Sequence, residues 1–133
     1  PAHVAARNKK YEWRANTAYE RLKDIKGIVV NRTNGAFYMT VMFEEGVLNA
    51  KQLLPVKDKA VKELVEKITN GVALDKRFVY YLLATTGICV VPLTGFNCNL
   101  KGFRITLLEN DETKFDMIFK TIREKILEYL KSA

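Results

Sequence analysis

The stretch that decides the fold is Leu82–Phe96, LLATTGICVVPLTGF, read together with Gly102–Leu108, GFRITLL. Gly87 is expected to end an apolar helix, because glycine adopts the left-handed conformation that closes a helix at little steric cost. The residues that follow predict an apolar strand over 88–91, a turn rich in Pro and Gly, and a second strand over 103–108. We expect the two strands to pair as neighbours.

One arginine, Arg104, lies inside the second strand, between Phe103 and Ile105. A guanidinium in an apolar strand loses its hydration at a high cost unless an anion meets it. The position of Arg104 therefore predicts a carboxylate or phosphate partner. That partner is either an acidic side chain of the chain itself or a ligand.

Composition describes an ordinary globular chain. With 133 residues, 48% of them hydrophobic and 28% charged, it is expected to fold as one domain with one core. The 22 Lys and Arg against 15 Asp and Glu give a net charge of +7, which would attract nucleic acid if it were gathered on one face. Mixed-sign runs such as Lys57–Lys59 indicate instead that the charge is spread over solvated helix surfaces.

The two cysteines, Cys89 and Cys98, have neither the spacing nor the nearby histidine of a metal site. They are expected to be free thiols, with Cys89 in the core. The longest apolar run, Phe78–Ala84, is far shorter than the roughly 20 residues that cross a bilayer. Since no leader sequence opens the chain, we expect a cytoplasmic protein.

The first half of the chain predicts a helix, a hairpin and a second helix. The first helix has an apolar stripe and is ended by Gly27, whereas Trp13 lies off the stripe and is either exposed or in contact with something outside this chain. Strands over 28–30 and 36–43 are expected to pair antiparallel through a turn at 33–35. The first stripe comprises Tyr11, Ala15, Ala18, Leu22 and Ile25.

Residues 44–55 show no period and predict a loop, and the segment 44–74 resembles an insertion that carries one amphipathic helix. Asp75 is expected to be the N-cap of the next helix. The last helix is expected to begin at Asn110 or Asp111. The apolar stripes of these three helices are Val61, Leu64, Val65 and Ile68; then Phe78, Val79, Leu82 and Leu83; and finally Phe115, Ile118, Phe119, Ile122, Ile126 and Leu130.

These elements predict an α+β fold, a two-layer sandwich in which helices pack on one side of a small, mainly antiparallel sheet. Their order, with the motifs NGAFYM (Asn34–Met39), TGICVVPLTGF (Thr86–Phe96) and GFRITLL (Gly102–Leu108), resembles the C-terminal small domain of fold-type I, class I/II, pyridoxal-phosphate-dependent aminotransferases. The resemblance runs through nearly all of residues 1–133 and is weakest over 44–70.

The resemblance implies a role for Arg104, because the arginine of this strand binds the α-carboxylate of the amino-acid substrate in that family. A planar guanidinium is well suited to hold a carboxylate by two charge-assisted hydrogen bonds. The alternative is an internal salt bridge to Glu109 or Asp111. The same analogy makes Phe37 and Tyr38 candidates to approach the substrate side chain, with core packing as an equal alternative.

The resemblance also implies that the full-length protein is a transaminase acting on amino acids and 2-oxo acids with pyridoxal phosphate, as a homodimer whose subunits each add a large domain. The lysine that carries the cofactor, in a Ser-x-x-Lys context, belongs to that large domain, and none of the lysines here stands in such a context. We therefore expect this chain alone to hold no catalytic residue, cofactor or metal, and to be inactive. Neither nucleic acid nor a membrane is expected as a partner.

Three alternatives stay open. A lyase or an acyl-transferring synthase of the same superfamily would share this domain and its arginine. A basic α+β module that binds nucleic acid would use the positive net charge, although the chain has no GXXG loop, helix-turn-helix signature or aromatic residues between clustered basic ones. An interaction domain without a ligand would be favoured if Arg104 were paired within the chain.

Overall fold

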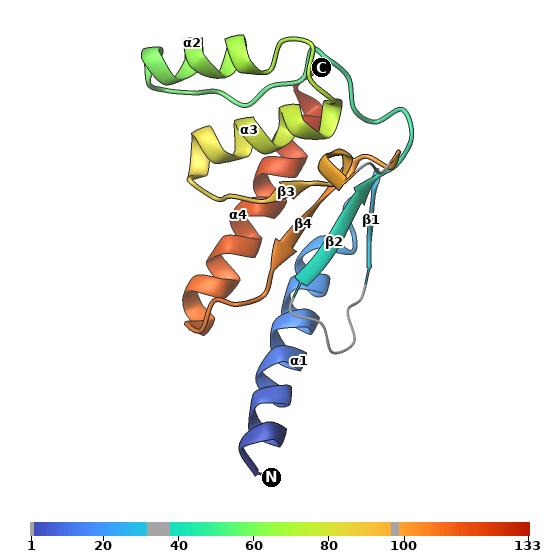
Figure 1. The fold of residues 1–133 in the computed structure, drawn as a ribbon, viewed down its shortest axis with the longest axis vertical. Coiled ribbons are helices and arrows are strands. Elements are labelled where there is room, and N and C mark those ends of the chain that lie inside the picture. The colour runs from blue at the N-terminus through green and yellow to red at the C-terminus, as the bar shows by residue number, and fades with distance from the viewer. Residues whose placement is uncertain (1, 32–37, 97–98) are drawn as a thin grey trace.

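The computed structural model describes residues 2–31, 38–96 and 99–133. Figure 1 shows α1 extending away from the rest of the molecule at its N-terminal end, with α2 at the opposite end. The elements follow the order α1 (Ala2–Leu22), β1 (Ile28–Val30), β2 (Tyr38–Phe43), α2 (Lys59–Ile68), α3 (Leu74–Thr86), β3 (Val91–Pro92), the short 3-10 helix η1 (Leu93–Phe96), β4 (Gly102–Thr106) and α4 (Glu112–Lys131).

The strands form one antiparallel sheet in the order β1-β2-β4-β3. Arg104 of β4 lies opposite Thr40 of β2 on one side and Val91 of β3 on the other. The predicted pairings of β1 with β2 and of β3 with β4 are therefore confirmed. The predicted turn at 33–35 and the first residues of the predicted strand 36–43 lie outside the described residues.

Among the described residues, helices pack on one face of the sheet, called the covered face, and none packs on the other, called the uncovered face. Met39, Val41, Phe103 and Ile105 point to the covered face and are buried in a single core with residues of α1, α3 and α4. Their neighbours along the strands are half-buried or exposed on the other face, since successive side chains of a strand alternate in direction. This arrangement confirms the predicted α+β sandwich. The neighbours on the uncovered face include Tyr38, Thr40, Met42, Arg104 and Thr106.

Four aromatic rings from four elements meet at the centre of the core. The ring of Phe78 on α3 lies 5.5 Å from that of Phe43 on β2, 5.6 Å from that of Phe103 on β4 and 5.1 Å from that of Tyr129 on α4. Three of these residues were predicted to lie in strands or buried helix faces. Tyr129 is fully buried and was absent from the predicted stripe of α4.

The first helix follows its predicted stripe, with Ala15, Ala18 and Leu22 buried. It ends at Leu22, so Ile25 is buried from the following turn and Gly27, at φ +96°, is where the chain reverses toward β1. Ile25 keeps the apolar spacing of the helix although it lies beyond the end of the helix. Periodicity alone therefore overestimates the length of a helix.

Four predictions around α3 and β3 were wrong. Asp75 is not the N-cap, because α3 begins at Leu74 after the cap residue Ala73, and Leu83 is 42% exposed. Gly87, in contrast, closes the helix at φ +76° as predicted. The strand predicted over 88–91 is shorter and later, because the N–H of Ile88 donates to the Thr86 hydroxyl (3.1 Å) and follows the helix cap. Cys89 on this stretch is exposed rather than in the core.

The predicted stripe of α2 is mostly uncovered. Only Val65 is buried, whereas Val61, Leu64 and Ile68 are 36%, 56% and 40% exposed. A helical period shows which side chains share a face, but it does not show how much of that face a neighbouring element covers. The prediction that 44–74 is an insertion stays a prediction.

The last helix begins as predicted, with the Asp111 carboxylate accepting a hydrogen bond from the Lys114 N–H (3.0 Å). Phe115, Phe119, Ile122 and Ile126 of its predicted stripe are buried, and Ile118 and Leu130 are half-buried. None of the helices in the described parts of the chain has the length and apolar composition of a membrane span.

Candidate functional site

Arg104 lies at the centre of the uncovered sheet face. Its strand, β4, has β2 on one side and β3 on the other, so the side chain stands between Thr40 and Val91. The residues on either side of it, Phe103 and Ile105, are buried on the covered face. Because successive side chains of β4 point to opposite faces, Arg104 can lie in an apolar strand without lying in the core.

Tyr38 lies beside Arg104 on the same face. The guanidinium carbon of Arg104 is 4.3 Å from the centroid of the Tyr38 ring, within the range of a cation–π contact. The ring face stabilises the cation. The structure thus brings together two of the three predicted site residues, and the third, Phe37, lies outside the described residues.

The two acidic residues considered as internal partners of Arg104 are engaged at the start of α4. Asp111 caps that helix, and the Glu109 carboxylate accepts a hydrogen bond from the Asp111 N–H (3.1 Å). Both follow the end of β4 at Thr106 by several residues. Their hydrogen bonds order the β4–α4 connection.

A buried carboxylate holds the start of β4. Asp75 is fully buried, and its Oδ2 accepts from the N–H of Thr94 (3.0 Å) and of Gly102 (3.4 Å). Its Oδ1 accepts from the Thr94 hydroxyl (2.6 Å) and from the N–H of Lys76 (2.9 Å). Sequence reasoning placed Asp75 at a helix cap and missed this network. No local signal distinguishes this role from a helix cap, because the partners Thr94 and Gly102 lie 19 and 27 residues away in the sequence.

Gly102 lets β4 approach β2 closely. A Cβ atom at this position would lie 2.1 Å from the Val41 carbonyl oxygen and 2.9 Å from the Met42 Cα, distances that real side chains do not show. The Phe43 N–H also donates to the Lys101 carbonyl oxygen (2.8 Å) just before β4 begins. The strand that carries Arg104 is therefore fixed at its start from two directions.

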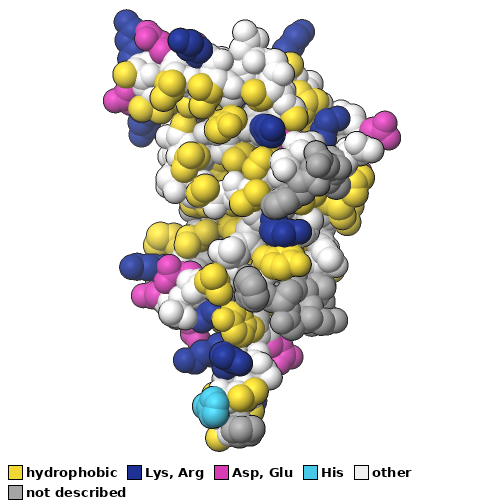
Figure 2. Space-filling view, in the orientation of Figure 1, with side chains coloured by type: hydrophobic (Ala, Val, Ile, Leu, Met, Phe, Trp, Pro, Cys, Tyr) yellow, Lys and Arg dark blue, Asp and Glu magenta, His cyan; other side chains and the backbone are white. Residues whose placement is uncertain are grey.

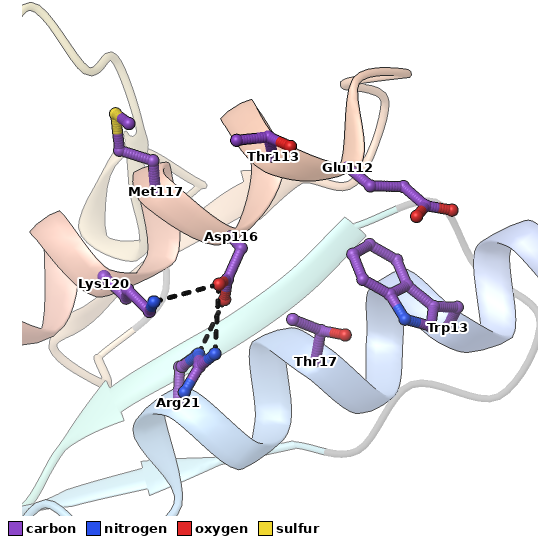
Figure 3. A pocket seen from close by; sticks show the side chains of 8 residues that line it. All are labelled: Trp13, Thr17, Arg21, Glu112, Thr113, Asp116, Met117 and Lys120. Carbon is purple, nitrogen blue, oxygen red and sulfur yellow. Dashed lines mark hydrogen bonds and ion pairs between the residues drawn. The ribbon is translucent and has the colours of Figure 1, made fainter.

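A separate cavity of about 560 Å³ lies between α1 and α4. Figure 3 shows Arg21 and Lys120 both directed at Asp116, with distances of 2.7 Å and 3.2 Å to its carboxylate oxygens. The hydrogen bond from Arg21 is the main cause that holds the pKa of Asp116 below its usual value. The Asp116 carboxylate in this cavity is therefore already paired with two cations.

Trp13 forms one wall of this cavity. Its ring centroid lies 5.8 Å from that of Phe115 on α4, and the residue is 38% exposed. The predicted exposure is confirmed in part, since the indole is partly exposed, and the indole also contacts Phe115 within the chain. A contact with something outside this chain stays a prediction.

Positive charge is more gathered than the sequence indicated. Figure 2 shows Lys and Arg side chains beside the histidine at the lower end of the molecule, on α1. A cavity of about 310 Å³ is lined there by His3, Arg7, Lys10 and Arg14, which recur every three or four residues on one face of α1. Mixed-sign runs describe the sequence neighbours of a charge, and on a helix the spatial neighbours lie three and four residues away.

The family's cofactor lysine lies in a Ser-x-x-Lys motif. The chain's one serine, Ser132, is followed by Ala133, so the 133 residues contain no Ser-x-x-Lys motif. The described residues contain no group of His, Cys, Asp and Glu side chains that could hold a metal ion. The chain thus offers a candidate substrate-binding arginine but no recognisable attachment point for the cofactor.

The fold is that of aminotransferases. It superposes on an aspartate aminotransferase from Rhizobium meliloti with a TM-score of 0.65 and 23% identity, over 98% of this chain and 27% of that one. An aminotransferase from Escherichia coli gives 0.63 and 19%, over 92% and 25% of the two chains. An alanine aminotransferase from Pyrococcus furiosus gives 0.56 and 25%, over 90% and 24%.

Sequence relatives agree with the fold, although no family model matches the chain. It is 51% identical over 130 residues to an uncharacterized aminotransferase of Methanocaldococcus jannaschii, which covers 98% of this chain and 30% of the relative. It is 35% identical over 83 residues to an inactive alanine aminotransferase of Saccharomyces cerevisiae, covering 62% and 14%. The chain is therefore homologous to a part of the aminotransferases, which confirms the resemblance, and it spans about 30% of the first relative's length.

Proposed function

We propose that this chain is the C-terminal small domain of a pyridoxal-phosphate-dependent aminotransferase, and that Arg104 binds the α-carboxylate of the amino-acid substrate. The observation that carries the proposal is the position of Arg104 on the one sheet face that the helices leave uncovered, beside Tyr38. On that face Arg104 is half-buried and points away from the core residues Phe103 and Ile105. The aminotransferase relatives support the same assignment.

Pyridoxal phosphate, bound by residues outside this chain, would supply the electron sink for amino-group transfer. The contribution of this chain is to bind and orient the substrate. The guanidinium of Arg104 would hold the carboxylate by two charge-assisted hydrogen bonds, and the sheet would fix its direction. Tyr38, against the guanidinium, would restrict where the arginine can point and form one wall beside the substrate.

The proposal extends to the longer protein. In it the chain would adjoin its own large domain and a second subunit of a cytoplasmic homodimer, with amino acids and 2-oxo acids as substrates. The isolated chain would be inactive, because it lacks an attachment point for the cofactor. Adding pyridoxal phosphate, an amino acid and a 2-oxo acid to the 133-residue chain should produce no amino-group transfer above the cofactor-only rate.

The decisive experiment uses the longer protein. Arg104→Ala should lose about a hundredfold or more in kcat/KM for the amino acid, because removing one partner of a buried charge pair costs about 2–5 kcal/mol. Arg104→Lys should recover only part of the loss, since an ammonium cannot bind a carboxylate in the same two-pronged way. Near-normal turnover in Arg104→Ala would refute the proposal.

Arg21→Ala is the matched control, because it removes an arginine whose ion pair with Asp116 lies between α1 and α4. It should keep kcat/KM within about twofold, as expected for a partly exposed ion pair far from the reaction. Far-ultraviolet circular dichroism and thermal unfolding of all variants should establish that activity losses do not come from unfolding. Identification of the product distinguishes amino-group transfer from elimination or acyl transfer.

A further inference from the structure

We infer that Asp75 is a positioning residue that sets the place of Arg104, and through it the affinity for the substrate carboxylate. The inference rests on the proposed function of Arg104. It adds a residue on another element, α3, that touches neither substrate nor cofactor. Asp75 would act by fixing the connection between β3 and β4 at both of its ends.

The geometry of Asp75 joins three segments. One carboxylate oxygen accepts hydrogen bonds from the N–H groups of Thr94, at the start of the connection, and Gly102, at its end (3.0 and 3.4 Å). The other oxygen accepts from the Thr94 hydroxyl at 2.6 Å. These contacts span 19 and 27 residues of sequence from α3. A single side chain thus closes the base of the loop that leads into β4.

Because Asp75 is buried, its carboxylate oxygens need hydrogen-bond donors from the protein. Asp75 is fully buried, and a carboxylate is retained at such a place only when donors satisfy its oxygens. Four hydrogen bonds do so here, three of them to the β3–β4 connection and one to the Lys76 N–H. A residue that served only to fill the first turn of α3 would need none of the three. The network therefore indicates that the position of the connection is what Asp75 determines.

The connection is linked to Arg104 from both sides. Gly102 begins β4 two positions before Arg104, and Thr94 follows Val91, the β3 partner of Arg104, by three positions. On its other side Gly102 lies so close to β2 that a Cβ added there would overlap the Val41 carbonyl oxygen, so there is little space between the two strands at this point. Loss of the Asp75 contacts would let the start of β4, together with Val91 of β3, move away from β2. A displacement of about 1 Å in a binding group is enough to cost a large factor in rate.

The primary test is Thr94→Val in the longer protein, because the exchange removes the hydroxyl bonded to Asp75 while keeping the shape of the side chain. It should raise KM for the amino acid by about tenfold and change kcat by less than about threefold, the pattern of a weakened binding group. Thr94→Ser, which keeps the hydroxyl, should restore KM to within about twofold. Asp75→Asn should act in the same direction, provided that the variant folds.

Thr85→Val is the matched control. The Thr85 hydroxyl donates to a carbonyl of its own helix, Tyr81 (2.8 Å), so its loss removes a hydroxyl hydrogen bond on α3 without touching the β3–β4 connection. It should leave KM within about twofold of the unchanged protein. Hydrogen exchange of the Gly102 amide gives a readout that does not depend on activity, and Thr94→Val should accelerate it at least about tenfold.

A double-mutant cycle separates positioning from a merely structural role. If Asp75 and Thr94 act through Arg104, then Thr94→Val in an Arg104→Ala background should raise KM by less than about twofold. An unchanged KM in Thr94→Val, or an equal effect in both backgrounds, would overturn the inference and leave the proposed function intact. Wild-type KM in Arg104→Ala alone would instead overturn the proposed function, and this inference with it.

Discussion

Arg14 on α1 donates a hydrogen bond from Nη1 to the carbonyl oxygen of Leu107, 93 residues later in the chain, at 3.0 Å. A second donor of the same guanidinium, Nη2, reaches the Asn110 side-chain oxygen at 3.0 Å. Arg14 is only 5% exposed. The first helix is therefore fastened to the segment that leads from β4 into α4, immediately after the strand that carries Arg104.

Arg14→Met should lower the free energy of unfolding by about 2–4 kcal/mol, because the apolar side chain leaves the Leu107 carbonyl and the Asn110 side chain without their buried donor. Urea denaturation followed by circular dichroism measures the difference. Arg7→Met is the control, since Arg7 is exposed on the same helix, and it should change the free energy by less than about 0.5 kcal/mol. Equal effects of the two substitutions would contradict the role assigned to Arg14.

Gly102→Ala should destabilise the fold by more than about 2 kcal/mol, since the added Cβ would lie 2.1 Å from the Val41 carbonyl oxygen and force β4 away from β2. Thermal unfolding measures the loss. Gly95→Ala provides the comparison, because its Cβ would have the Pro92 ring at 3.9 Å as its nearest neighbour. A Gly102 variant as stable as the Gly95 variant would show that the two strands are farther apart than described.

Stability at alkaline pH should depend on Tyr129. Burial is the main cause that raises the pKa of Tyr129 to about 12 from its usual 10.0, and the charge of Arg77 lowers it in part. Because the folded state holds the phenolic proton more tightly, its contribution is fully present below pH 10.0 and is lost as the pH rises toward 12. Free energies of unfolding measured across this range should fall with pH more steeply in the wild type than in Tyr129→Phe.

The same substitution should cost little at neutral pH. The Tyr129 hydroxyl is buried, and within the described residues the Arg77 side chain interacts with it without the geometry of a full hydrogen bond, so its removal takes away a group that burial has already separated from water. Tyr129→Phe should therefore differ from wild type by less than about 1 kcal/mol at pH 7. A loss of several kcal/mol would indicate that the hydroxyl makes a full hydrogen bond.

Truncation of the adjacent α2 residues Leu64 and Val65 to alanine should change the free energy of unfolding by very different amounts. Val65→Ala should cost about 1–3 kcal/mol, because Val65 is the buried contact of α2, whereas Leu64→Ala should cost less than about 0.5 kcal/mol. Chemical denaturation of the 133-residue chain compares them directly. A similar cost at both positions would mean that the outer face of α2 is covered in solution.

Most elements of the fold followed from local sequence signals. Gly87 ended α3 and Asp111 began α4 as expected, because both act through the backbone of their own helix end. The alternation of β4 was equally readable, since two apolar residues flank Arg104. Features of this kind depend on neighbours within about four residues, which can be read directly from the sequence.

Features that depend on distant neighbours were missed or misjudged. Asp75 has the residue type and the position of a cap, and its use by Thr94 and Gly102 depends on where β3 and β4 fold back. Leu83 and Leu64 belong to apolar periods, yet no described element covers them fully. For the site, the sequence singled out Arg104 and Tyr38, and only the structure showed that they touch.

The meeting of Phe43, Phe78, Phe103 and Tyr129 makes β2, α3, β4 and α4 parts of one cooperative unit. The Phe78 ring contacts the other three rings, so opening of α3 breaks all three contacts and opening of β2, β4 or α4 breaks at least one. Phe103 immediately precedes Arg104. The backbone that carries Arg104 is therefore tied directly to the aromatic centre of the core, which limits how far a residue proposed to orient the substrate can shift.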